Sequence, residues 1–166
     1  MTKVFILFLV AAEVFIWLTS AALPPNMASH FAAGGAADGF MSRGAYVGVM
    51  LGVTLVAPLL VALSGQLVNV LPARLINLPN RQYWLAPQRR AATIASLSSL
   101  SIYFASALVV FLCFVHWLVV RANEAPVPRL EPVPMFVGLA LFLVGTVVWL
   151  IVLVRRFSSV PHAVDR

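Results

Sequence analysis

The twenty residues Met135–Val154, MFVGLALFLVGTVVWLIVLV, contain no charged side chain and decide the class of fold. An α-helix needs about 20 predominantly apolar residues to cross the ~30 Å hydrocarbon core of a bilayer. Arg155 and Arg156 follow directly, where basic side chains reach the level of the lipid head groups. This stretch therefore predicts a transmembrane helix over residues 135–154.

Three further apolar runs have the same character. They cover residues 4–23, 46–70 and 91–120. Within lipid, only helices and closed barrels satisfy all their backbone hydrogen bonds internally, and runs of this length are typical of helices. The sequence thus predicts an all-α membrane protein, a four-transmembrane-helix bundle that forms a single membrane domain over residues 1–166.

The first run also shares features with a secretory signal peptide. Lys3 precedes it, and residues 20–22 (SAA) suit a cleavage site. Glu13 and Trp17, however, interrupt the apolar region. We therefore expect a retained first transmembrane helix.

The composition agrees with a membrane location. Hydrophobic residues make up 62% of the chain and charged residues only 10%, whereas an ordinary soluble domain has about 25% charged residues. The net charge of +6 comes from Lys and Arg residues at the ends of the apolar runs, where they set orientation and meet anionic lipid. We expect the lipid bilayer as a partner and no nucleic acid.

The distribution of basic residues predicts the orientation. Eight lie on one side of the predicted bundle, namely Lys3, Arg74, Arg81, Arg89, Arg90, Arg155, Arg156 and Arg166, and three on the other, namely Arg43, Arg121 and Arg129. Because cytoplasmic segments carry the excess of Lys and Arg, both termini are expected in the cytoplasm. Residues 24–45 then form an outer loop and residues 71–90 a cytoplasmic interfacial segment. We expect a multi-pass protein of a bacterial inner (plasma) membrane.

A GxxxG spacing occurs in the second apolar run, at Gly48 and Gly52. Two small residues on one helix face allow close contact with another helix. The spacing is common by chance in apolar helices, so packing within the chain is at least as well supported as dimerisation.

The outer loop carries a distinct pattern, LPPNMASHFAAGGAADGFMSR over residues 23–43. Its characteristic members are Leu23, Pro24, His30, Phe31, Gly34, Gly35, Asp38, Gly39, Phe40, Ser42 and Arg43. The pattern resembles a bacterial integral-membrane domain of unknown function, which also forms the N-terminal part of SdpI-type toxin-immunity proteins. Residues 77–90, NLPNRQYWLAPQRR, are similar to stand-alone short members of that group. The chain lacks the longer C-terminal region of SdpI-type proteins, so the resemblance implies a fold and a family rather than the immunity function itself.

His30 and Asp38 are the loop residues best suited to chemistry. They are eight residues apart in a glycine-rich segment and are candidates to hold a metal ion or a peptide ligand. Two ligands fall short of the three or four of a usual metal site, and Asp-Gly pairs favour turns. We therefore expect a structural role and no metal.

Three polar residues are expected at membrane depth: Glu13, Tyr103 and His116. An ionisable residue such as Glu13 is costly in lipid and is a functional candidate by default. A proton relay needs a chain of such groups, so we favour a structural polar contact over transport. His116 has no second histidine at a matching depth for haem, and we expect no cofactor.

The cytoplasmic segment contains a group of interfacial residues: Asn80, Arg81, Tyr83, Trp84, Arg89 and Arg90. Tyr and Trp favour the membrane interface, and the arginines suit phospholipid head groups or an acidic patch on a partner. Lipid anchoring is the favoured interpretation.

Known catalytic motifs are absent from the sequence, including the nucleophile elbow, the Walker loop, HExxH and CxxC. The sequence favours a non-enzymatic accessory or interaction subunit of a larger membrane assembly, bound to other membrane subunits or to itself. One alternative is an SdpI-like receptor or immunity protein that binds an extracellular peptide through residues 24–43. Another is a small proton-linked transporter that depends on Glu13.

Overall fold

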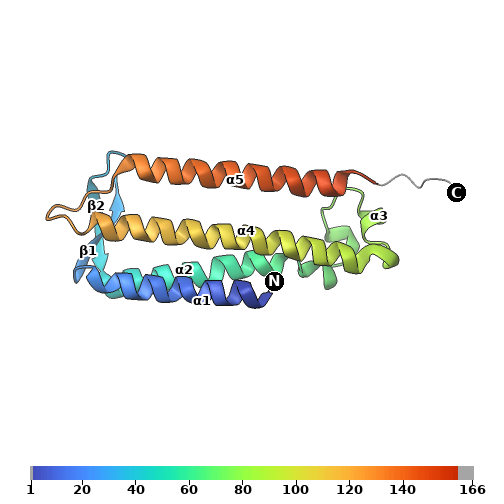
Figure 1. Ribbon diagram of the computed structural model, residues 1–166, viewed down its shortest axis with the longest axis horizontal. Coiled ribbons are helices and arrows are strands. Elements are labelled where there is room, and N and C mark those ends of the chain that lie inside the picture. The colour runs from blue at the N-terminus through green and yellow to red at the C-terminus, as the bar shows by residue number, and fades with distance from the viewer. Residues whose placement is uncertain (1, 161–166) are drawn as a thin grey trace.

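The computed structural model describes residues 2–160, and four long helices dominate it (Figure 1). They are α1 (Thr2–Thr19), α2 (Arg43–Ser64), α4 (Pro87–Ala122) and α5 (Pro132–Ser158). All four are long and apolar enough to cross a membrane. The prediction of an all-α fold with four membrane-spanning helices is confirmed.

The bounds of α2 differ from the predicted range 46–70. The helix begins at Arg43 because the Ser42 side chain caps it, accepting a 3.2 Å hydrogen bond from the Ala45 amide. It ends at Ser64. A Cβ on Gly65 would lie 2.7 Å from the Ser98 backbone, so the glycine lets the chain pass close against α4.

The longest helix, α4, has 36 residues and starts at Pro87, which suits the first helical position. At about 1.5 Å per residue it is ~54 Å long, well over the ~30 Å of hydrocarbon. In Figure 1 it continues past the N-terminal end of α1. Part of α4 therefore projects beyond the bilayer core.

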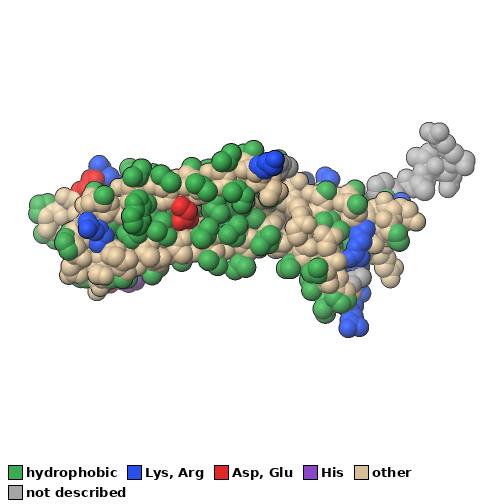
Figure 2. Space-filling model, turned by 90° about the horizontal axis from the view of Figure 1, so that it is seen from below, with side chains coloured by type: hydrophobic (Ala, Val, Ile, Leu, Met, Phe, Trp, Pro, Cys, Tyr) green, Lys and Arg blue, Asp and Glu red, His purple; other side chains and the backbone are tan. Residues whose placement is uncertain are grey.

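The core lies between α1, α2 and α4, while α5 runs along α4 (Figure 1). Midway along the bundle, side chains of α1 and α4 form a buried cluster of Phe5, Leu9, Ala12, Ala105 and Val109. The apolar window of α5 contains no buried residue. Hydrophobic side chains also cover much of the face shown in Figure 2. Such a surface requires lipid as its solvent.

The GxxxG pair of α2 does not pack within the described part of the chain. A Cβ added at Gly48 or Gly52 would meet no heavy atom of another element within 4 Å, and the same holds for Gly44. Of the two interpretations that the sequence left open, packing within the chain does not occur at this exposed face among the described residues.

Residues 24–45 are not an irregular loop, and this part of the prediction needs correction. Asn26–Phe31 (β1) and Ala37–Ser42 (β2) pair as an antiparallel hairpin (Figure 1). The register shifts between Ala28 and Phe31, and the Gly-rich stretch between the strands forms the turn. The end of the molecule that carries this hairpin is called the hairpin end below.

The opposite end consists of short elements that connect α2 to α4. They are the 3-10 helices η2 (Leu67–Asn69) and η3 (Ala73–Leu75) and the short helix α3 (Arg81–Trp84). Residues 66–86 are called the cap segment below, and their end of the molecule the cap end. No separate domain forms there.

Candidate functional site

The hairpin is fixed to the helices by one amide side chain. Asn123, just after α4, accepts a 2.8 Å hydrogen bond from the Ala28 amide and donates a 2.9 Å bond to the Ala28 carbonyl. It also donates to the Val119 carbonyl at 2.9 Å. Because Asn123 replaces a neighbouring strand for Ala28, the edge of β1 is held against the end of α4.

Two further contacts fix the hairpin at its base and its tip. At the base, the Arg43 guanidinium donates to the Leu23 carbonyl at 3.1 Å. At the tip, the Leu130 amide donates to the Gly35 carbonyl at 2.9 Å. Gly35 has φ +84° and a Cβ there would lie 2.0 Å from the Leu130 carbonyl oxygen, so only glycine fits. The hairpin is thus a rigid platform on the bundle.

His30 and Asp38 meet across the two strands of this platform. Their Nδ1 and Oδ1 atoms are 2.5 Å apart, and the side chains are 76% and 47% exposed. Gly39 faces His30, since a Cβ at Gly39 would lie 2.9 Å from the His30 Cβ. In residues 2–160, no group of three or more His, Cys, Asp or Glu side chains is arranged to hold a metal ion. The pair therefore offers two polar groups to a partner at the surface.

The aromatic residues of the pattern have different environments. Phe40 is 56% exposed on β2. Phe31 is half-buried and packs against the cluster that contains Leu23, Met27 and Tyr46. The exposed surface of the hairpin thus combines the His30–Asp38 pair with one outward-facing ring, a surface suited to contact with another protein.

His116 lies beneath the hairpin and is completely buried. Its Nε2 is 2.8 Å from the Thr19 hydroxyl and its Nδ1 is 3.0 Å from the Tyr46 hydroxyl. The ring also stacks on Tyr46, with centroids 5.7 Å apart. Both ring nitrogens are therefore engaged, and His116 links α1, α2 and α4.

Glu13 lies midway along α1 and is partly buried. Its Oε1 atom is inaccessible and has no hydrogen-bond partner among the described residues. Ser106 and Thr146, which lie at a similar depth, donate to carbonyls of their own helices. Tyr103 is 62% exposed, on the face of α4 toward α5. The polar groups are thus not assembled into a chain around Glu13.

At the cap end, Asn80 and Trp84 hold the last turn of α5. The Trp84 indole donates to the Phe157 carbonyl at 2.8 Å, and the Asn80 amide donates to the Ser158 carbonyl at 2.8 Å. The last carbonyls of a helix have no partner within the helix. These two side chains therefore join the cap segment to α5 by satisfying such groups.

The three arginines predicted to be interfacial, Arg81, Arg89 and Arg90, also contact the chain itself. Arg81 donates to the Arg74 carbonyl at 3.1 Å, and Arg90 donates to the Val68 carbonyl at 2.8 Å. The Arg89 guanidinium lies 4.0 Å from the centroid of the Tyr83 ring. These three arginines therefore have a structural role at this end, in addition to any ligand that they bind.

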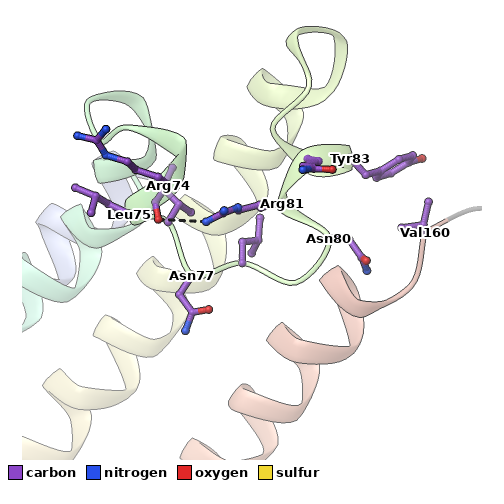
Figure 3. Close-up of a pocket in the computed structure, with 10 residues that line it drawn as sticks. Arg74, Leu75, Asn77, Asn80, Arg81, Tyr83 and Val160 are labelled. Atoms are coloured by element: carbon purple, nitrogen blue, oxygen red, sulfur yellow. Dashed lines mark hydrogen bonds between the residues drawn. The ribbon is translucent and has the colours of Figure 1, made fainter.

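A hollow of about 690 Å³ lies within the cap segment, lined by Arg74, Asn77, Asn80, Arg81, Tyr83 and Val160 among others (Figure 3). In Figure 3 the Arg81 side chain points toward the Arg74 carbonyl, and Asn80 and Tyr83 lie on the side of Val160. Its polar groups do not converge on one point. The geometry fits a binding site less well than the platform at the hairpin end.

Sequence reasoning missed how three residues organise the ends of the bundle. Asn123 follows the third apolar run and precedes a Pro-rich connection, which was a signal for a helix end but not for a strand partner. Asn80 and Trp84 were identified only as interfacial residues. Their carbonyl partners on α5 are more than seventy residues away in the sequence and could not be inferred from local patterns.

The fold and the exposed apolar faces define a multi-pass membrane protein with a rigid β-hairpin at one end. Comparison with protein-family models, with curated proteins and with solved structures found no match to this chain.

Proposed function

We propose that this chain is a non-enzymatic accessory subunit of a larger membrane assembly and that it binds its partner through the hairpin. His30, Asp38 and Phe40 form the contact surface. The proposed kinship with the membrane domain of SdpI-type proteins concerns the fold of this region and does not require an immunity function.

The observation that supports the proposal is the combination of rigidity and exposure. Asn123 and Gly35 hold the hairpin against the helix ends, while Phe40 and the His30 side chain remain exposed. An exposed aromatic side chain on a pre-ordered backbone loses little conformational entropy on binding. Aromatic residues are also enriched at protein interfaces.

The proposed orientation places the hairpin outside the cytoplasm. Basic residues at the cap end are Lys3, Arg74, Arg81, Arg89, Arg90, Arg155 and Arg156, and the hairpin end has Arg43, Arg121 and Arg129. Arg166 lies outside the described residues. The hairpin end also carries Asp38, Glu124 and Glu131, whereas no acidic residue occurs at the cap end within residues 2–160. This asymmetry favours a cytoplasmic cap end, in a bacterial inner membrane, because retained cytoplasmic segments are rich in Lys and Arg.

Purification from native membranes in mild detergent tests the proposal. A double variant, His30→Ala with Phe40→Ala, should lose the co-purifying membrane proteins that the wild type retains. Val127→Ala is the matched control, because Val127 is a hydrophobic residue with 80% exposure at the same end. Retention of the same proteins by the double variant would contradict the proposal.

The same surface supports a second function, that of a receptor or immunity protein for an extracellular peptide. The exposed His30–Asp38 pair offers hydrogen-bonding groups to such a peptide. This function predicts that expression of the chain protects cells against a peptide toxin, and that the double variant loses the protection. Co-purification of a partner subunit, with no protection of the cells against the toxin, would favour the accessory function instead.

Glu13 supports a third function, proton-linked transport. Its Oε1 atom has no hydrogen-bond partner in the described part of the chain, and such an acid in a membrane helix is costly to retain. Reconstituted protein should then carry a proton flux that Glu13→Gln abolishes. Equal flux through wild type and variant would exclude this function.

A further inference from the structure

A long groove separates α4 from α5 on one side of the bundle. It encloses about 730 Å³ between the two helices and is almost entirely apolar. Its wall includes stacked rings, with centroids 4.7 Å apart for Phe104 and Trp149 and 4.5 Å apart for Phe111 and Phe142. These rings hold α5 beside α4 and leave the space along them unfilled.

The groove continues toward the cap end into a second hollow of about 420 Å³. Tyr103 lines both hollows. Along α4 the lining residues Ala92, Ser96, Ser99, Tyr103, Ala107 and Val110 recur at intervals of three and four. Residues with this spacing share one face of a helix, so the two hollows follow one another along the same face of α4, with Tyr103 between them, and together they are called the channel below.

The two ends of the channel differ chemically. Toward the hairpin end, Phe114 packs directly on Gly138, since a Cβ at Gly138 would lie 2.1 Å from the Phe114 ring. Toward the cap end, Arg156 lines the second hollow. Arg156 makes no hydrogen bond or ion pair with the residues that the structure describes, and no acidic residue lines either hollow. The channel is therefore apolar at one end and basic at the other.

We propose that this channel binds a phospholipid with an anionic head group. The acyl chain lies along the aromatic wall between α4 and α5, and the phosphate lies beside Arg156 and the Ser96 hydroxyl. From Tyr103 to Phe114 the apolar part is about 16 Å long at ~1.5 Å per residue, close to half of the ~30 Å hydrocarbon core. On α5 the lining extends from Pro134 to Trp149, so the apolar part is not confined to one leaflet, and Arg156 lies beyond it toward the cap end.

The dimensions favour a lipid over a second helix. A transmembrane helix with its side chains is about 10 Å across and ~30 Å long, so it occupies roughly 2,400 Å³. The 730 Å³ of the apolar groove would therefore receive only the side chains along one face of such a helix, whereas an acyl chain lies in it along its length. A helix also has no need for a cation at one end, whereas a guanidinium pairs with a phosphate through charge-assisted hydrogen bonds.

Native mass spectrometry of the full chain in mild detergent tests this site, with phosphatidylglycerol and phosphatidylcholine as probes. The wild type should bind phosphatidylglycerol more tightly, and Arg156→Gln should reduce that affinity about tenfold, the factor expected for one charge-assisted hydrogen bond. Arg155→Gln is the matched control, because the neighbouring Arg155 does not line the channel. Its effect should be less than twofold.

A second variant tests the acyl-chain part of the site. Ala107→Phe places a ring in the groove and should weaken binding of both lipids while the fold, measured by circular dichroism, is kept. Equal losses for Arg155→Gln and Arg156→Gln, or unchanged binding by Ala107→Phe, would overturn the proposal. The proposal would also be overturned if the wild type were a dimer and Ala107→Phe made it a monomer without any effect on lipid binding, since the groove would then hold a second copy of the chain.

Discussion

Removal of the Asn123 side chain tests how the hairpin is held. Asn123→Ala deletes the hydrogen bonds to the amide and the carbonyl of Ala28, as well as the bond to the Val119 carbonyl. Ala28 is completely buried, so water cannot replace the lost partners without movement of the strand. We therefore expect β1 to detach from the end of α4.

The magnitude follows from the two groups left without partners. A buried donor or acceptor that loses its partner costs about 1–3 kcal/mol, so two groups predict a loss of about 2–6 kcal/mol in the free energy of unfolding. Asn123→Asp keeps an acceptor for the Ala28 amide but loses both donated bonds. It also places a carboxylate oxygen against the Ala28 and Val119 carbonyl oxygens, so its loss should be at least as large as that of Asn123→Ala.

Two measurements check this prediction in mild detergent. Thermal unfolding followed by circular dichroism gives the loss of stability, and hydrogen exchange should accelerate at the hairpin amides before those of the helices. Glu124→Ala is the control, because its ion pair with Arg121 is exposed and such pairs contribute about 0–1 kcal/mol. If Asn123→Ala and Glu124→Ala behave alike, the hairpin is not held in the way described.

Five other substitutions follow from the geometry, each checked by the same thermal unfolding measurement. Gly35→Ala should lower the free energy of unfolding by about 2 kcal/mol or more, since the φ of +84° and the nearby Leu130 carbonyl exclude a side chain. Gly34 lies in open space, so Gly34→Ala should change it by less than about 0.5 kcal/mol. Equal effects of the two substitutions would contradict the assigned turn. Trp84→Phe should cost only about 1 kcal/mol, because the Phe157 carbonyl keeps its bond from Asn80, and no loss at all would mean that the indole bond does not form. Tyr46→Phe should also cost about 1 kcal/mol. His116→Ala should cost about 3 kcal/mol, because it leaves a cavity and an unpaired hydroxyl. A larger loss for Tyr46→Phe than for His116→Ala would contradict the arrangement around His116.

The four helices could be predicted because lipid imposes a simple rule on the sequence. A run such as 135–154 must satisfy its backbone internally and needs about 20 apolar residues, and both requirements are visible locally. Helix ends are set by finer chemistry. Ser42 caps the N-terminus of α2, and Pro87 is the first residue of α4. Both helices therefore begin earlier in the sequence than the predicted starts at 46 and 91.

The hairpin could not be predicted from the residues between 24 and 45. Its strands are short, the register has two irregularities, and the edge of β1 pairs with the Asn123 side chain from a distant part of the chain. A two-stranded hairpin is marginal by itself in water and needs such support. The glycine-rich pattern indicated turns, and only Gly35 has the positive φ that glycine favours.

The candidate sites, too, could be predicted from the sequence only in part. His30 and Asp38 were identified from the sequence, and the structure brings them together across the strands. The channel beside α5 was not identified, because Ala107, Gly138 and Phe111 resemble ordinary lipid-facing residues in the sequence. It depends on the distance between two helices, which local patterns do not encode.

Labelling of single cysteines tests most directly whether the hairpin end and the cap end lie on opposite faces of a membrane. In a Cys113→Ala background, Gly34→Cys and Gln88→Cys place one exposed thiol at each end of the bundle. A membrane-impermeant maleimide should label Gly34→Cys in intact cells and Gln88→Cys only after the membrane is opened. Labelling of both positions from the same side of the intact membrane would contradict the crossing by α2, which lies between them, and with it the four-helix arrangement.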